Sequence, residues 1–433
     1  MYKRQFQELN YHEVYGGVAK KVIRMDDASR IPEQLNQAWL AALSGRPGPV
    51  VIELPEDMLK DLSEVEDLAT AAINSPAPSR QDMSRLEELI DQARDPIVIA
   101  GGAAWAPGAT KFLREFSEKF QVPVATAFRR SDSFDNSHPH YIGELGLGPN
   151  PKLVEQARES DLLIAVGPRL GDMTTAGYTT LEPPHRANCN PDQKLVHVHV
   201  SGDEIGSVFS VDLGIVSTPE NFLAAACEMT PGDIDRSERL TRGNEVYREW
   251  LTQERNPNSA VRMDLVMDHL RDTLTNDAVI TVGAGNFSVW GQRNFQFGSR
   301  HRFLGSTNGS MGYGVPSAIA AKLALPNHTV VSFSGDGCFL MNGQELATAM
   351  QYNLAVIFLV VNNSRYGTIR NHQEKHYPGR VSATGLDNPD FAALARAYGA
   401  HGELVTATDQ FPEAFDRAKN AGSAALIELQ VDY

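Results

Sequence analysis

The stretch Ser334-Gly335-Asp336-Gly337-Cys338 follows the apolar run 329–333, and Asn363 follows a second apolar run, 355–361. Asp336 and Asn363 are 27 positions apart, and residues 342–353 between them have the length and composition of one crossover helix. A strand–helix–strand unit of this kind makes its two strands parallel and neighbouring. We therefore predict that both motifs lie at the carboxyl edge of one parallel sheet, where open α/β sheets bind ligands.

The residue types at these two strand ends suit the capture of a diphosphate through Mg²⁺, which prefers about six hard oxygen ligands. The predicted metal ligands are the Asp336 carboxylate, the Asn363 side-chain oxygen and the backbone carbonyl of Arg365. Gly335 and Gly337 allow the backbone to approach a phosphate closely. The alternative is an ordinary strand-to-helix turn, because Gly-Asp-Gly alone is common; Asn363 at the next strand end favours the metal–diphosphate hypothesis.

Three segments resemble the thiamine diphosphate (ThDP) enzymes of the acetolactate synthase and pyruvate oxidase type. Residues 335–363 resemble the ThDP motif, residues 309–321 (GSMGYGVPSAIAA) resemble GTMGFGLPAAIGA, and residues 44–57 (SGRPGPVVIELPED) resemble SGRPGPVVLELPEDV. The resemblance extends from Phe6 to the C-terminus. It implies an α/β fold with doubly wound parallel sheets, in which a Rossmann-like central domain precedes a ThDP-binding domain.

The resemblance also implies which residues bind the cofactor. The backbone at Gly309 and Met311 would hold the aminopyrimidine ring, although Met311 could instead be a simple core gap-filler. The glycine loop after the strand at 278–282 would contact the diphosphate, although an ordinary strand-to-helix turn is an alternative there. The complete predicted set is Gly285, Asn286, Gly309, Ser310, Met311, Gly335, Asp336, Gly337, Cys338, Asn363, Tyr366 and Gly367.

Three residues are candidates for a catalytic role on the same grounds. The Met311 side chain would support the bent conformation of the cofactor. His372 stands where biosynthetic acetohydroxyacid synthases carry a substrate-selecting Trp; it could donate a proton near neutral pH or be a surface histidine. Gln7, within a segment that resembles AFQE, would line the substrate channel of a neighbouring subunit.

Composition restricts the class of protein. The 433 residues contain 39 Lys and Arg against 54 Asp and Glu, a formal charge of −15, so we expect neither nucleic-acid nor membrane partners. There is no apolar run of about 18 residues, the length of a transmembrane helix, and residues 1–6 lack an apolar signal core. Three scattered cysteines without a Cys-x-x-Cys pair favour reduced thiols and a cytoplasmic location.

The chain divides into five parts by pattern. We predict a remnant of a pyrimidine-binding domain at 1–60, a linker at 61–80, a Rossmann-like central domain at 81–232, a charged connector at 233–258 and a diphosphate- and Mg-binding domain at 259–433. Helices are expected at 31–43 and 108–120. Strands are expected at 50–54, 96–100, 122–126, 162–166, 195–200 and 278–282, and the first of these is expected to be buried.

The first part corresponds only to the C-terminal portion of a pyrimidine-binding domain, and on the order of 100 residues of that domain have no counterpart. In the family, a glutamate of the segment without a counterpart activates the cofactor ring. Glu8, Glu13 and Glu53 do not match its position. We therefore expect a shortened version of a longer enzyme, with a naturally impaired chain as the alternative.

The central block contains a weak nucleotide-binding pattern. Gly101-Gly102 and Gly167-Pro168-Arg169 resemble turns that seat FAD in some family members, but residues 170–175 depart from that version and His199 stands where an acidic residue is frequent. We therefore expect an empty or vestigial nucleotide site, without FAD.

The expected function is ThDP- and Mg²⁺-dependent decarboxylation of a 2-oxo acid followed by transfer of the remaining unit to a second carbonyl, as in acetolactate synthase. Simple decarboxylation, as in benzoylformate or indolepyruvate decarboxylase, and a non-catalytic ThDP-fold protein remain alternatives. The resemblance implies a homodimer or homotetramer, because the family builds its site between subunits.

Overall fold

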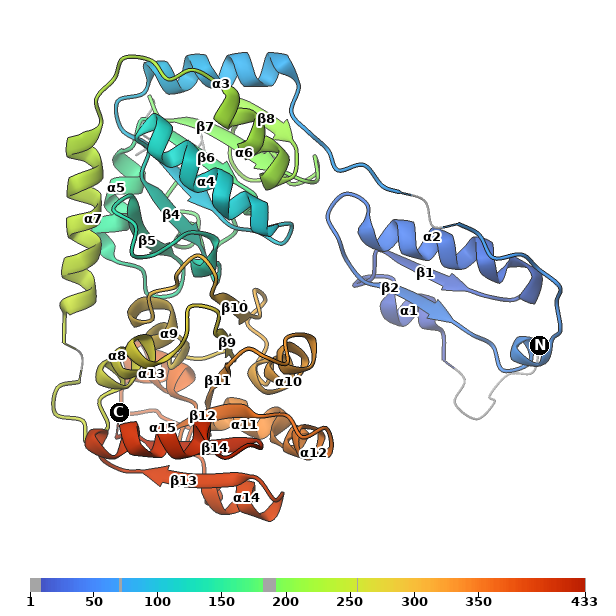
Figure 1. Cartoon of the computed structure of the whole chain (residues 1–433), viewed down its shortest axis with the longest axis vertical. Coiled ribbons are helices and arrows are strands. Elements are labelled where there is room, and N and C mark those ends of the chain that lie inside the picture. The colour runs from blue at the N-terminus through green and yellow to red at the C-terminus, as the bar shows by residue number, and fades with distance from the viewer. Residues whose placement is uncertain (1–8, 70–71, 182–191, 255, 433) are drawn as a thin grey trace.

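The computed structural model of this protein describes residues 9–69, 72–181, 192–254 and 256–432. The strands in these residues form two six-stranded sheets and one two-stranded sheet, and all their pairings are parallel (Figure 1). The predicted α/β class with doubly wound parallel sheets is thus confirmed. Each helix in the described residues is too short or too polar to cross a bilayer.

The central sheet has the strand order β5-β4-β3-β6-β7-β8, which is the order of dinucleotide-binding sheets. The order reverses between β3 and β6, and their ends approach so closely that a side chain on Gly102 would collide with the carbonyl group of Gly167. The strands are β3 (Pro96–Ala100), β4 (Val124–Ala127), β5 (Tyr141–Leu145), β6 (Leu162–Val166), β7 (Lys194–His199) and β8 (Leu213–Val216).

Helices cover both faces of this sheet. They begin with residue types that commonly start helices. Ser79 and Asp82 form a capping box at the start of α3, and proline opens the next three helices. The long helix α7 (Ser237–Thr252) packs against β5, where the rings of Tyr247 and Tyr141 meet edge to face. The other helices are α3 (Arg80–Gln92), α4 (Pro107–Phe120), α5 (Pro151–Glu159) and α6 (Pro219–Glu228).

The C-terminal sheet has the strand order β10-β9-β11-β12-β14-β13. The strand order reverses beside β9, between β9 and β11. Alternate residues of the strands enter two hydrophobic clusters, one on each face, as expected for a parallel sheet covered by helices on both sides. The strands are β9 (Val279–Val282), β10 (Arg302–Gly305), β11 (Val330–Gly335), β12 (Val356–Asn362), β13 (His401–Val405) and β14 (Ala425–Gln430).

The crossover from β11 to β12 differs from the single helix predicted at 342–353. It consists of α11 (Asp336–Asn342), a 3₁₀ turn at Gly343–Glu345 and α12 (Leu346–Gln351). Glycine is a poor helix former, and Gly343 packs against the ring of Phe339 so closely that a Cβ would come within 2.7 Å of it. The remaining helices are α8 (Met263–Thr273), α9 (Ser288–Asn294), α10 (Gly314–Ala324), α13 (Gly367–His376), α14 (Phe391–Ala397) and α15 (Phe411–Lys419).

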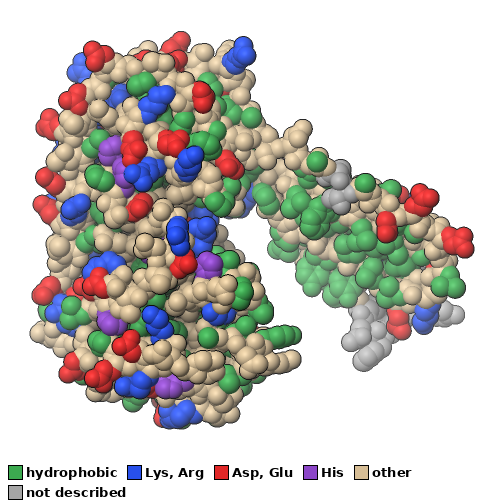
Figure 2. Space-filling model, in the orientation of Figure 1, with side chains coloured by type: hydrophobic (Ala, Val, Ile, Leu, Met, Phe, Trp, Pro, Cys, Tyr) green, Lys and Arg blue, Asp and Glu red, His purple; other side chains and the backbone are tan. Residues whose placement is uncertain are grey.

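The N-terminal unit lies to one side of the two large sheets (Figure 1). It contains α1 (Tyr11–Tyr15), β1 (Lys21–Arg24), α2 (Ile31–Leu43) and β2 (Val50–Glu53). The prediction that this last strand is buried was wrong: all four of its residues are only partly buried, because the sheet has just two strands. Apolar side chains gather on the surface of this unit (Figure 2), among them Leu35, Trp39 and Leu43.

The two large sheets are joined by hydrogen bonds from the loop after β4. Asn136 exchanges two bonds with Phe297, through its backbone N–H (2.8 Å) and its side-chain oxygen (3.0 Å). The Asp132 carboxylate accepts a bond from the N–H of Phe303 on β10 at 3.1 Å. These contacts fix the carboxyl edges of the two sheets toward each other.

Glu144 on β5 is a partly buried carboxylate in the same region. It accepts hydrogen bonds from the Arg129 N–H (3.1 Å) and the Ser131 hydroxyl. Burial nevertheless raises the pKa of Glu144 to about 7, with the hydrogen bonds and the Arg129 charge opposing that rise and the nearby Asp132 adding to it. The folded protein therefore keeps this carboxyl protonated up to a higher pH than the unfolded chain does.

This raised pKa predicts a pH-dependent loss of stability. The contribution of protonated Glu144 to the free energy of unfolding is complete below the ordinary glutamate pKa, and it is lost as the pH rises through about 7. As the pH rises from 5 to 8, the free energy of unfolding of Glu144→Gln should therefore increase relative to that of wild type by on the order of 2 kcal/mol. Urea unfolding measures this difference. Glu155→Gln, at an exposed position on α5, is the control; parallel pH profiles for wild type and Glu144→Gln would contradict the prediction.

Candidate active site

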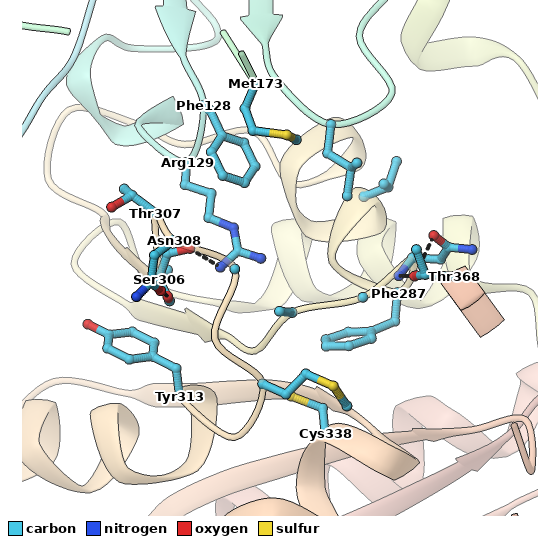
Figure 3. Close-up of a pocket in the computed structure, with 18 of the residues that line it drawn as sticks. Phe128, Arg129, Met173, Phe287, Ser306, Thr307, Asn308, Tyr313, Cys338 and Thr368 are labelled. Atoms are coloured by element: carbon cyan, nitrogen blue, oxygen red, sulfur yellow. Dashed lines mark hydrogen bonds between the residues drawn. The ribbon is translucent and has the colours of Figure 1, made fainter. Parts of the chain in front are cut away.

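A cavity of about 1540 Å³ lies where the carboxyl edges of the two sheets face each other (Figure 3). From the central sheet it is lined by residues that follow β3, β4 and β6, and from the C-terminal sheet by residues at the ends of β9, β10, β11 and β12. Both strand-order reversals thus open into one cavity, which is where α/β sheets bind ligands.

Asp336 is the best-defined polar group of the cavity. It is 3% exposed and begins α11, directly after β11. One carboxylate oxygen accepts a hydrogen bond from the N–H of Gly337 at 2.8 Å, and the other accepts a bond from the side-chain amide of Asn388, also at 2.8 Å. These two bonds hold the carboxylate in one orientation.

Asn388 belongs to a hydrogen-bonded chain that runs across the sheet edge. Its amide group also donates to the Asn362 side-chain oxygen (2.8 Å), and the Asn362 amide donates to Glu428 on β14 (2.7 Å). Glu428 accepts a further bond from the N–H of Phe391, the first residue of α14 (3.0 Å). The side-chain oxygen of Asn388 is buried and has no hydrogen-bond partner among the described residues.

Glycines flank Asp336 on both sides. A Cβ on Gly335 would come within 2.7 Å of the Phe287 ring, and one on Gly337 within 2.5 Å of the Tyr366 ring, so only glycine lets these two rings pack this closely against the turn. The loop 363–366 after β12 is held by backbone bonds to the segment 384–386, and the Asn363 oxygen accepts the Arg365 N–H at 3.3 Å.

The side-chain oxygens available here favour a cation whose coordination shell is completed by a bound ligand. Within the described ranges, no three His, Cys, Asp or Glu side chains converge to form a closed metal site. Asp336 and Asn363 instead supply two hard oxygens that directly follow the neighbouring strands β11 and β12, and both residues line the cavity. Such a partial set fits Mg²⁺ that shares its other ligands with a diphosphate and water.

The loop after β10 is preorganised by its own side chains. The Asn308 oxygen accepts bonds from the Ser310 N–H (3.1 Å), the Ser310 hydroxyl (2.8 Å) and the Ser306 hydroxyl. Gly309 follows in a left-handed conformation (φ 75°), and Met311, 37% exposed, lines the cavity. The loop therefore presents its backbone to the cavity in a fixed shape.

Asn286 and Thr368 connect two other loops that line the cavity. The Thr368 hydroxyl accepts the Asn286 N–H at 3.1 Å and donates to the Asn286 side-chain oxygen at 2.9 Å (Figure 3). The segment after β9 and the first turn of α13 are thereby held together.

Cys338 is a buried thiol beside the same loops. Its sulfur accepts a hydrogen bond from the N–H of Gly312 at 3.0 Å. Burial raises the pKa of Cys338, opposed by this bond, so the side chain stays a neutral thiol at physiological pH. It contributes packing and a weak hydrogen-bond acceptor.

Most of the residues predicted from the sequence are brought together in this cavity. It is lined by Gly285, Asn286, Gly309, Met311, Gly335, Asp336, Gly337, Cys338, Asn363, Arg365, Tyr366 and Gly367. Ser310 lies in the same loop but does not line it. His372 is not brought to the cavity: it is exposed on α13 and its ring stacks on His376. Gln7 lies outside the described residues.

Sequence reasoning missed the contribution of the central sheet and of Asn388. Phe128, Arg129 and Met173 line the cavity with residues from C-terminal loops (Figure 3). The Asn-Pro-Asp sequence at 388–390 indicates only a turn before α14. No local pattern places Asn388 against Asp336, 52 residues earlier.

The family comparisons agree with this geometry. Residues 83–226 match the family described as thiamine pyrophosphate enzyme, central domain, and residues 283–429 match thiamine pyrophosphate enzyme, C-terminal TPP binding domain. The two matches cover the central sheet and the C-terminal sheet from β10 onward, and they define a thiamine diphosphate-dependent enzyme, thiamine pyrophosphate being the same compound.

Individual relatives show to which type of ThDP-dependent enzyme the chain is similar. The acetolactate synthase large subunit of Parasynechococcus marenigrum is 30% identical over 440 residues, which cover 98% of this chain and 69% of that protein. The isozyme 2 large subunit of Escherichia coli is 28% identical, covering 99% and 76%, and the large subunit of Corynebacterium glutamicum is 28% identical, covering 98% and 68%. The chain belongs to the acetolactate synthase-type family of ThDP-dependent enzymes, which confirms the resemblance.

The hydrogen bond between Asn388 and Asp336 should affect the affinity of the site for ThDP. Asn388→Ala should weaken ThDP binding, measured in the presence of Mg²⁺, about tenfold, because a charge-assisted hydrogen bond worth about 1.5–3 kcal/mol orients the carboxylate. Calorimetric titration measures the affinity. Asn420→Ala, which removes an exposed bond to the Asp416 carbonyl in the same sheet unit, should leave it unchanged. Equal affinities for wild type and Asn388→Ala would show that the carboxylate is oriented without Asn388.

Proposed function

We propose that this protein uses ThDP and Mg²⁺ to decarboxylate a 2-oxo acid and transfers the remaining unit to a second carbonyl compound, as an acetolactate synthase does. The observation that carries the proposal is that Asp336 and Asn363 share one cavity with the preorganised loop at Gly309 and Met311. The similarity to acetolactate synthase large subunits supports the same reaction class.

Bound ThDP would supply a carbon nucleophile and an electron sink for decarboxylation. Asp336 and Asn363 would hold Mg²⁺ and, through it, the diphosphate. The backbone at Gly309 and Met311 would orient the aminopyrimidine ring, and the Met311 side chain would support the bent cofactor, which is a proximity effect.

The wall above these groups would complete the site. Tyr366 and Thr368 lie at the start of α13 and line the cavity. The bonds between Thr368 and Asn286 fix this wall against the loop after β9, so that the wall would orient a substrate and limit access of water.

We also propose that the protein acts as a homodimer or homotetramer. The membership of the chain in the acetolactate synthase-type family supports this assembly, as does the exposed apolar surface of the N-terminal unit.

The reaction is tested by incubating the protein with pyruvate, ThDP and Mg²⁺ and measuring acetolactate, acetaldehyde and CO₂. Acetolactate is expected for wild type, and Asp336→Ala should lose Mg²⁺-dependent ThDP binding as well as turnover, because it removes the anionic ligand. Acetaldehyde alone would replace the proposal by simple decarboxylation. ThDP binding without turnover of any 2-oxo acid would leave a non-catalytic cofactor-binding protein.

A second variant separates binding from orientation. Met311→Ala should keep ThDP affinity within about threefold but lower turnover about tenfold or more, because proximity effects are large. Leu340→Ala, at an exposed apolar position on α11, is a control of similar chemistry. An unchanged turnover number for Met311→Ala would exclude the supporting role of this side chain.

A further inference from the structure

We propose that Arg129, from the central sheet, is a positioning residue for the cofactor site: it holds the two loops of the C-terminal sheet that contact the cofactor. The inference rests on the proposed cofactor site. Arg129 follows β4, whereas the two loops follow β9 and β10.

The guanidinium group of Arg129 makes two hydrogen bonds across the interface between the sheets. One nitrogen donates to the carbonyl oxygen of Gly283 at 2.8 Å, and another donates to that of Ser306 at 2.6 Å. Gly283 opens the loop that contains Gly285 and Asn286, and Ser306 opens the loop that contains Gly309. One side chain therefore fixes the first residue of both loops.

The cost of placing a charge here indicates a specific role. Arg129 is 2% exposed, and burial lowers its pKa, opposed mainly by the charge of Glu144. Its guanidinium binds two neutral carbonyl groups, and its Nε has no hydrogen-bond partner among the described residues. A buried cation without a bidentate anion is expensive.

The conformation of Arg129 is itself enforced from the central sheet. Its backbone is left-handed (φ 57°), which is uncommon for a residue other than glycine. Its N–H is held by the Glu144 carboxylate at 3.1 Å, and its guanidinium lies 5.1 Å from the centre of the Phe128 ring. Gly305 has no side chain to obstruct it: a Cβ there would come within 2.9 Å of the Arg129 side chain.

The chain offers a matched control in Arg236. It is also buried (6% exposed) and also donates to backbone carbonyl groups, those of Phe120, Ile90 and Ala93, at 2.6–2.9 Å. All of those groups belong to the central block, and Arg236 does not line the cavity. Loss of either arginine should destabilise the fold, but only loss of Arg129 should affect the cofactor.

The experiment compares ThDP affinity in the presence of Mg²⁺, by calorimetry, for wild type, Arg129→Met, Arg129→Lys and Arg236→Met of the full chain. Arg129→Met should bind ThDP about tenfold more weakly and Arg129→Lys, which reaches one carbonyl at most, about threefold. Arg236→Met should bind like wild type while its thermal midpoint falls. Amide hydrogen exchange should increase at residues 284–287 and 307–311 only in the Arg129 variants.

Each other result would overturn the inference. Wild-type affinity in both Arg129 variants, or equal losses in Arg129→Met and Arg236→Met, would reduce Arg129 to a structural residue. If Arg129→Met does not fold, Arg129→Lys decides by the same criteria. A wild-type chain that does not bind ThDP would refute the cofactor site itself, which is a different outcome from binding that is insensitive to Arg129.

Discussion

The parallel pairing of both large sheets is the constraint on which the rest of the structure depends. Because parallel strands all end at one edge, each sheet gathers its loops on a single side. Asp132 and Asn136 then tie the two edges face to face through Phe303 and Phe297. A cavity lined by strand ends from both sheets follows from these two facts.

Two kinds of hydrogen bond organise the cavity: bonds within a single loop, and bonds between residues that are distant in the chain. Its C-terminal side is organised by local hydrogen bonds, such as those of Asn308 within its own loop. Its buried carboxylate, Asp336, is instead oriented by Asn388, which is distant in the chain. Arg129 connects the two sheets at the point where the loops after β9 and β10 begin.

The sequence predicted much of the fold because the signals were local. The strands at 96–100 and 162–166 each follow an aspartate and precede a glycine, and they were found with these limits. The single crossover helix was wrong because Gly343 interrupts it where Phe339 leaves no room for a side chain. The buried strand at 50–54 was wrong because burial depends on how many strands a sheet has.

The sequence by itself determined the strand-end motif around Asp336 and Asn363, the glycine loop at Gly309 and the resemblance to ThDP enzymes, because these depend on short segments of fixed spacing. Only the tertiary structure placed Arg129 and Asn388 in the site and left His372 outside it. The reason is physical: a hydrogen bond between residues 52 or 177 positions apart has no local pattern, and exposure on a helix is decided by what packs against it.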